Sequence, residues 1–289
     1  MAPLADLAPE AARAVRAVLA DIDDTLTSEG RLTAAAYAAL EDLHAAGLVV
    51  VPVTGRPAGW CDLVARFWPV DGVVGENGAF AFRYDHGAKT MRRRFWASER
   101  ERAANRVRLD ALAQEILARV PGAALSADQP YRVADLAIDV AEDVAPLPPE
   151  RVDEILRLCE AAGATAKLSS IHVNAWFGAY DKLGLAREML SAEFGLESAH
   201  APEKVLFAGD SPNDEPMFRA FPLSVGVANI HDSGQRLKHW PAYVTPSRGG
   251  QGFVELAQRL LVGRAEPGGR AQPRAGKTPW RAMQKLKVR

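Results

Sequence analysis

Acidic residues follow two apolar runs in this chain. Asp21, Asp23 and Asp24 come directly after the run VLA, and Asp210 and Asp214 lie in the stretch GDSPND after the run VLFA. Two unit charges ~4 Å apart repel by roughly 4 kcal/mol at an effective dielectric constant near 20, so crowded carboxylates at the end of a buried strand need a neutralising partner. Ligands of open α/β sheets bind at the carboxyl ends of the strands, and we expect these acids to meet there around a cation.

Other polar residues are expected at the same edge. Thr54 and Gly55 end the β-branched run LVVVPV, Lys182 stands at the start of a predicted helix, and Asn213 lies inside GDSPND. An all-oxygen site with no nearby histidine or cysteine ligand selects a hard cation, for which Mg²⁺ is the usual choice. The sequence therefore predicts a magnesium site that also binds phosphate.

Each group has a plausible role in phosphoryl transfer. Asp21 is the predicted nucleophile, which forms an aspartyl-phosphate and divides the hydrolysis into two steps. Asp23, two residues on, is placed to protonate the leaving oxygen and then to deprotonate water. Thr54 and the Gly55 amide are predicted to donate to phosphoryl oxygens, and Lys182 is predicted to balance their charge and that of Asp21.

Structural interpretations of the same residues remain open at this point. Asp and Thr are common in caps and turns, so Asp214 also suits a helix cap near Pro216. Lys182 also suits a solvated helix position. Arg56, which follows Gly55, is a candidate phosphate ligand or a partner of a carboxylate.

The order of elements predicts an α/β fold. Strand, helix, strand, helix, strand is typical of a Rossmann-like, doubly wound parallel sheet. The third strand is expected at 71–79, and the helix before it is expected to carry Trp60, Val64 and Phe67 or Trp68 on one face. The other strands of the sheet are expected at 16–21, 48–56, 204–210 and in LSVGVAN and AYVT, with helices from Thr33, after Lys182 and in GFVELAQRLLVG.

A separate α+β module interrupts this pattern. A hairpin is expected at 80–84 and 93–96, helices at 98–119 and 149–162, and strands at 136–140 and 166–176. We therefore predict a catalytic core at 1–84 and 176–262, an inserted cap domain at 85–175, and a basic, disordered tail at 263–289.

The motifs DIDDT, VTGR, YDKLGLA and GDSPND, in this order, resemble those of the haloacid dehalogenase superfamily of phosphatases. The resemblance spans about residues 16–262, and the inserted module is similar to the large-cap, C2B or Cof-type branch, which includes phosphatases of sucrose phosphate, trehalose phosphate and mannosylglycerate phosphate. It implies metal ligation by Asp21, the backbone carbonyl of Asp23, and Asp210, with Asp214 in or beside that shell. Two positions depart from the branch, which usually has Gly at Asp24 and no residue such as Leu183 between the lysine and glycine of its third motif.

The predicted function is that of a Mg²⁺-dependent phosphoric monoester hydrolase acting on a small phosphorylated metabolite, in particular a sugar phosphate. A phosphomutase of the phosphomannomutase type is the alternative enzyme, and a non-catalytic binding or regulatory module is the alternative outside enzymes. Within the cap, His172, Asn174 and Trp176 alternate along one strand and share a face, which either recognises the sugar or is exposed to solvent.

Composition limits the partners. The net charge is −1 over 289 residues, so no overall field favours nucleic acid or an anionic membrane. Cys61 and Cys159 are the two cysteines, too few for a disulfide framework, and the N-terminal stretch lacks the pattern of a secretory signal. We expect a cytoplasmic monomer or homodimer with a small phosphorylated substrate and neither nucleic acid nor membrane as partner.

Overall fold

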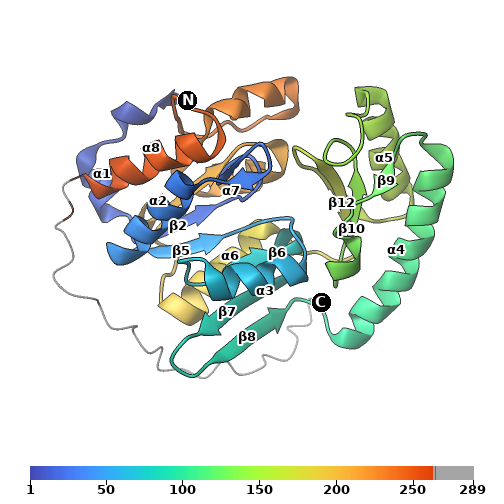
Figure 1. Ribbon diagram of the computed structural model, residues 1–289, viewed down its shortest axis with the longest axis horizontal. Helices are drawn as coiled ribbons and strands as arrows, with labels where there is room; N and C mark the ends of the chain where they lie inside the picture. The colour runs from blue at the N-terminus through green and yellow to red at the C-terminus, as the bar shows by residue number, and fades with distance from the viewer. Residues whose placement is uncertain (263, 265–289) are drawn as a thin grey trace.

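A six-stranded parallel sheet forms the centre of the molecule, with the order β1-β15-β14-β13-β2-β5 (Figure 1). The computed structural model describes residues 1–262 and residue 264. The strands are β1 (Ala2–Pro3), β2 (Ala17–Ala20), β5 (Val49–Pro52), β13 (Val205–Gly209), β14 (Leu223–Gly226) and β15 (Tyr243–Val244). β2 lies between β5 and β13, so its carboxyl end is at the centre of one edge of the sheet.

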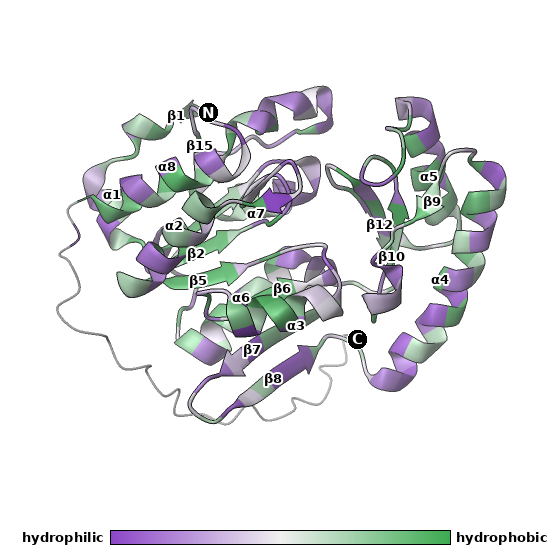
Figure 2. Cartoon of the chain, in the orientation of Figure 1, coloured by the Kyte–Doolittle hydropathy of each residue, from purple (hydrophilic) through white to green (hydrophobic). Residues whose placement is uncertain are grey.

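Helices cover both faces of this sheet because its strands are apolar on both faces. Val18 and Ala20 of β2 belong to one hydrophobic cluster, and Ala17 and Leu19 belong to a second one. The first cluster includes residues of α1 (Pro9–Ala14), α2 (Ala34–Ala45), α3 (Ala58–Phe67) and α8 (Gly249–Leu261). The second includes residues of α6 (Lys182–Phe194) and α7 (Glu215–Ala220). The predicted doubly wound fold is confirmed, and Figure 2 shows β2 and β5 in the green of apolar residues.

The third predicted strand of the parallel sheet forms a different sheet. β6 (Val73–Gly75) pairs antiparallel with β7 (Phe80–Asp85), which pairs in turn with β8 (Thr90–Phe95). A single parallel bridge between Val53 and Val74 joins this three-stranded sheet to the central one. A short hairpin, β3 (Thr27–Ser28) and β4 (Arg31–Leu32), follows the first acidic loop.

A second body, which we call the cap, lies beside the carboxyl ends of the central strands (Figure 1). It contains a four-stranded antiparallel sheet with the order β11-β12-β10-β9. Its elements are α4 (Glu99–Arg119), β9 (Ala124–Leu125), β10 (Leu136–Asp139), α5 (Pro149–Ala161), β11 (Thr165–Leu168) and β12 (His172–Trp176). A hydrophobic cluster of its own, with Leu109, Ile116, Ile138 and Cys159, packs the two helices against the sheet.

Short 3₁₀ helices connect several of these elements. They are η1 (Leu4–Asp6), η2 (Glu76–Gly78), η3 (Gln129–Tyr131), η4 (Pro202–Lys204), η5 (Pro212–Asp214) and η6 (Ala228–Arg236). The division into domains predicted from the sequence stays a prediction. The hairpin β7–β8 bears on it, because Phe80 and Phe82 pack in the core cluster rather than in the cap cluster.

The predicted apolar face of α3 is only partly buried. Val64 is buried and Trp68, just after the helix, packs against the core cluster. Trp60 is 47% exposed and Phe67 is 72% exposed, whereas Cys61 is buried. The predicted face therefore extends from the core to the surface of the molecule.

The predicted disordered tail lies almost entirely outside the described residues. Arg264 is described, and its guanidinium donates to the carbonyl oxygens of Ala12 and Val15 at 2.6 and 2.9 Å. Among the described residues, no helix has the length and apolar character needed to cross a membrane.

Gly78 brings the end of η2 against the start of α6. Its φ is +103°, and a Cβ at this position would lie 2.1 Å from the carbonyl oxygen of Asp181. Residues with a Cβ disfavour such a positive φ, and a Cβ cannot lie so close to a carbonyl oxygen. Gly78 therefore permits the close approach that places the neighbouring Lys182.

Replacement of Gly78 should destabilise the protein more than replacement of a glycine that has only an unusual φ. We expect Gly78→Ala to cost about 3 kcal/mol in the free energy of unfolding, through strain and overpacking together. Gly195→Ala is the matched control, because Gly195 has φ +63° with nothing within 4 Å, and it should cost about 1 kcal/mol. Chemical denaturation measures both, and equal costs would contradict the proposed close contact.

Candidate active site

Three buried carboxylates meet where β2 and β13 end. Asp21 follows β2, Asp210 follows β13, and Asp214 ends η5. One oxygen from each lies within 4.8 Å of the others. The parallel pairing of the two strands brings these residues together although they lie far apart in the sequence.

Lys182 supplies a positive charge to this group. Its Nζ lies 2.8 Å from Asp21 Oδ1 and 2.8 Å from Asp214 Oδ1. The side chain is 4% exposed, so the interpretation of Lys182 as a solvated helix lysine is wrong. Asp181 caps α6 by accepting from the Gly184 amide at 2.7 Å, and this cap fixes the first turn that carries Lys182.

The carboxylates are not neutralised by Lys182 alone. Burial raises the pKa of Asp21 to about 7, although Lys182 acts in the opposite direction. Burial and the charges of Asp21 and Asp214 also raise the pKa of Asp210 well above its usual range. Oxygen ligands crowded in this way suit a divalent hard cation, which would favour their ionised forms. The residues present therefore fit Mg²⁺.

Two residues that the sequence analysis did not single out orient Asp210. The Thr25 hydroxyl donates to Oδ1 at 3.2 Å, and the Asn229 amide donates to Oδ2 at 3.2 Å. Thr25 closes the motif DIDDT, so its position was visible in the sequence, and Asn229 follows β14 at the same edge of the sheet. Asp214 accepts from the Asp210 amide through Oδ2 while Oδ1 faces Lys182.

Asp23 is paired with Arg56. The guanidinium of Arg56 donates from Nε to Asp23 Oδ2 at 2.9 Å and from Nη2 to Oδ1 at 2.8 Å. Arg56 is 4% exposed, and the charge of Asp23 is among the causes that raise its pKa. Of the two interpretations left open for Arg56, the structure shows the ion pair.

The remaining predicted phosphate ligands are Thr54 and Gly55, which follow β5, and Asn213 within η5. Thr54 is fully buried, and its Oγ1 accepts from the Arg56 amide at 3.0 Å, which leaves the hydroxyl hydrogen free to donate elsewhere. The Gly55 carbonyl accepts from Arg132 of the cap at 2.8 Å. Asn213 is 7% exposed and accepts from the Ser211 hydroxyl at 2.7 Å.

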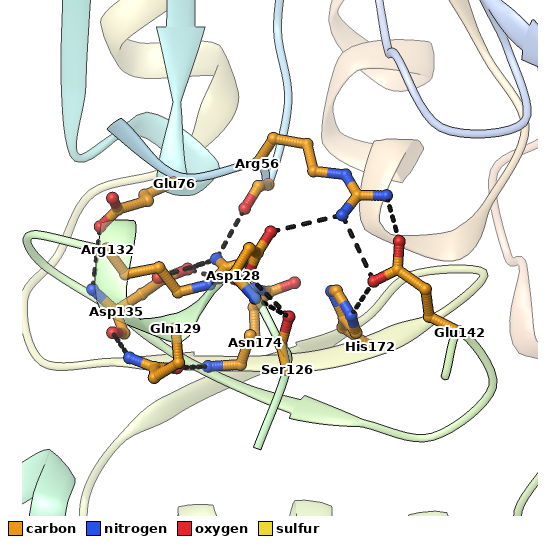
Figure 3. Close-up of polar contacts among 12 residues, drawn as sticks. Arg56, Glu76, Ser126, Asp128, Gln129, Arg132, Asp135, Glu142, His172 and Asn174 are labelled. Carbon is orange, nitrogen blue, oxygen red and sulfur yellow. Dashed lines mark hydrogen bonds and ion pairs between the residues drawn. The ribbon is translucent and has the colours of Figure 1, made fainter. Parts of the chain in front are cut away.

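The His172, Asn174 and Trp176 face of β12 is buried, so the interpretation as a solvent-exposed face is wrong. His172 Nε2 lies 2.8 Å from Glu142, and Asn174 donates to Asp135 at 3.1 Å (Figure 3). Trp176 stacks on Tyr180 with 5.5 Å between ring centroids.

Both departures from the family motifs are accommodated. Asp24 has φ +56°, a left-handed conformation that Gly adopts freely and Asp tolerates. This explains why Gly is usual at its place. Leu183 packs beside the apolar cluster under α6, so Lys182 keeps its position next to Asp21.

A cavity of about 620 Å³ opens between the core and the cap. Asp24 and Asp210 line it from the core, and Val140, Leu147 and Leu168 line it from the cap. It reaches the acidic cluster through Asp210, so it offers space beside the candidate site for a small molecule.

Sequence reasoning missed the acidic residues with which the cap meets the core. Asp128 and Glu142 both contact Arg56, at 3.3 and 2.6 Å (Figure 3). Glu76 of the core accepts from the Ala134 amide of the cap at 2.6 Å. No motif surrounds these residues, so spacing in the sequence carried no signal for them.

The chain matches the family described as haloacid dehalogenase-like hydrolase over residues 18–104. It is 28% identical over 247 residues to a phosphoglycolate phosphatase of Archaeoglobus fulgidus, and the match covers 85% of this chain and 96% of that protein.

Solved structures share the fold. The sucrose-phosphatase of Synechocystis is 16% identical with a TM-score of 0.56, and the match covers 86% of this chain and 98% of that one. The C-terminal domain of trehalose-6-phosphate phosphatase of C. albicans is 14% identical with a TM-score of 0.63, and the match covers 87% and 94%. The family match and the phosphoglycolate phosphatase confirm the resemblance predicted from the motifs and the prediction of a phosphatase enzyme. The solved structures confirm the fold class.

The metal-free protein should lose stability as the pH rises. A carboxyl whose pKa is higher in the folded than in the unfolded state stabilises the fold below the unfolded value, near 3.8 for Asp21, and this contribution is lost as the pH rises to about 7. Without metal, the Tm of the wild type should fall by at least about 3 °C more than that of Asp21→Asn between about pH 5 and about pH 8. Excess Mg²⁺ should remove the difference, and parallel Tm curves without metal would contradict it.

Proposed function

We propose that this haloacid dehalogenase-like hydrolase removes phosphate from a small phosphorylated metabolite through an aspartyl-phosphate on Asp21. The observation that supports this proposal is the position of Lys182, 2.8 Å from both Asp21 and Asp214 within a buried acidic cluster. A buried, oriented carboxylate with an adjacent cation suits a nucleophile that attacks an anionic substrate.

Each residue of the site has a proposed role in the reaction. Lys182 favours the ionised form of Asp21 and offsets the charge of an entering phosphate. Thr54 and the Gly55 amide donate hydrogen bonds to phosphoryl oxygens. Asp23 gives a proton to the leaving oxygen and later takes one from the water that attacks the phosphorus.

Asp21, Asp210 and the backbone carbonyl of Asp23 are the proposed ligands of Mg²⁺, with Asp214 in or beside that set. Bound Mg²⁺ would reduce the repulsion between the attacking carboxylate and the phosphate. Thr25 and Asn229 keep the Asp210 carboxylate oriented toward this position.

A sugar phosphate is the proposed substrate class. Asp128 and Glu142 of the cap contact the same guanidinium, that of Arg56, as Asp23 does. Substrate hydroxyl groups suit such carboxylate acceptors better than a second carboxylate does. The similarity to the phosphoglycolate phosphatase of Archaeoglobus fulgidus makes 2-phosphoglycolate the second candidate substrate. A screen of phosphorylated sugars and 2-phosphoglycolate decides between them through the values of kcat/KM.

We expect inorganic phosphate as the product. An isomerised sugar phosphate would be the product of the alternative enzyme, a phosphomutase. We also propose a cytoplasmic location, with which the free and buried Cys61 and Cys159 agree. A monomer or homodimer remains our expectation for the assembly.

Loss of the nucleophile or of the metal should abolish turnover. Asp21→Asn keeps the size of the side chain and removes its charge, and we expect phosphate release to fall by at least about 10³-fold. Excess chelator should stop the wild type, and added Mg²⁺ should restore it. Glu10→Gln, which alters an exposed acid on α1, serves as the control. Full activity in chelator would contradict the proposed metal dependence.

Asp23→Ala should reveal the proton donor through the leaving group. Alkyl phosphates leave poorly without a proton, so their turnover should fall by about 10²-fold or more, whereas aryl phosphates should lose much less. The ratio of kcat for the two ester classes is the measurement. A transfer of phosphate between positions of a sugar without phosphate release would favour the phosphomutase instead.

A further inference from the structure

Arg56 joins the core to the cap through one guanidinium group. On the core side it holds both carboxylate oxygens of Asp23. On the cap side Nη2 donates to Glu142 Oε1 at 2.6 Å and Nη1 donates to Asp128 Oδ2 at 3.3 Å (Figure 3). Three carboxylates from two bodies therefore share one planar cation.

The fork of Arg56 has little freedom to rotate while all of these contacts are present. Its carbon Cζ lies 4.5 Å from the centroid of the Trp60 ring, and the residue is 4% exposed. Arginine donors have a fixed geometry, so the position of the guanidinium also sets the orientation of the carboxylate that it holds. Any shift of Glu142 relative to the core is therefore transmitted to Asp23.

Glu142 is itself fixed within the cap. His172 Nε2 lies 2.8 Å from its Oε2. The amides of Ala141, Glu142 and Asp143 donate to the Asp139 carboxylate at 3.0, 2.8 and 2.9 Å, which holds the turn after β10. The Glu142 side chain is therefore held in a fixed position relative to the cap sheet.

We propose that Glu142 is a positioning residue of the cap, which orients the proton donor Asp23 through Arg56 and so makes proton transfer depend on the cap lying over the core. The inference rests on the proposed phosphatase function. Orientation of a catalytic group contributes several orders of magnitude to rates, and a loose Asp23 would lose part of that contribution.

Other contacts should hold the cap in place when Glu142 is changed. Glu76 accepts from the amides of Val133, Ala134 and Asp135 at 2.9, 2.6 and 3.1 Å. Arg132 donates to the Gly55 carbonyl at 2.8 Å. None of these contacts includes Arg56 or Glu142, so a Glu142 variant tests the link to Asp23 and not the attachment of the cap.

The first test measures kcat and KM of Glu142→Gln in the full chain with alkyl and aryl phosphates. We expect kcat for the alkyl phosphate to fall by about tenfold or more, kcat for the aryl phosphate to change by less than about twofold, and KM to stay within about twofold. Arg56→Lys, which loses the fork, should show the same dependence on the leaving group.

The matched control is Asp110→Asn, which alters an exposed cap carboxylate that faces Arg106 on α4. It should leave both ester classes unchanged. Equal losses of kcat for both classes in Glu142→Gln would mean a general structural role and overturn the inference, as would the absence of any loss.

A second test does not depend on turnover. The Tm shifts of Asp23→Asn and Glu142→Gln should be non-additive when Arg56 is present and additive in an Arg56→Gln background. Additive shifts with Arg56 present would overturn the inference. If the wild type released phosphate from no ester while the coupling was found, the proposed function would fail and the physical link would remain.

Discussion

The Lys182 ammonium lies 2.8 Å from Asp21 and 2.8 Å from Asp214, in a buried group that also contains Asp210, and the rest of the site depends on this contact. Without Lys182, three carboxylates would share a buried volume with no positive charge from α6 beside them. With it, the balance is still negative, and burial still raises the pKa of Asp21 to about 7. The arrangement is therefore stable only with a proton or a metal ion in addition, which suits a site that admits Mg²⁺ and a phosphate.

The fold forms this contact because a few elements lie close together at one edge of the sheet. β2 and β13 pair side by side and end at the same edge, so Asp21 and Asp210 meet. Gly78 lets the chain pass against Asp181, and Asp181 caps the helix that begins with Lys182. The cap adds a second charge link, in which Arg56 joins Asp23 of the core to Glu142.

Much of the core was predictable because its signals are local. The apolar runs before Asp21 and Asp210, and the helix start at Lys182, fixed the edge of the sheet at which the acids meet. β6 was assigned to the wrong sheet, since a short apolar strand does not reveal its partner. The predicted face of α3 was only partly right, because Val64 is buried but Trp60 and Phe67 are exposed although they are large and apolar. The roles of Asp128 and Glu142 of the cap were not predicted, because these residues lie far from Arg56 in the sequence and contact it only in the folded chain.

The central claim is that Asp21 carries the phosphoryl group during turnover. The most direct measurement is an acid quench of the enzyme during steady turnover of a phosphate ester with Mg²⁺, followed by digestion and mass spectrometry of the peptides. The account predicts a phosphorylated peptide whose modified residue is Asp21, present only when substrate and metal are both added. Turnover with no phosphorylated peptide, or with the phosphoryl group on another residue, would contradict it.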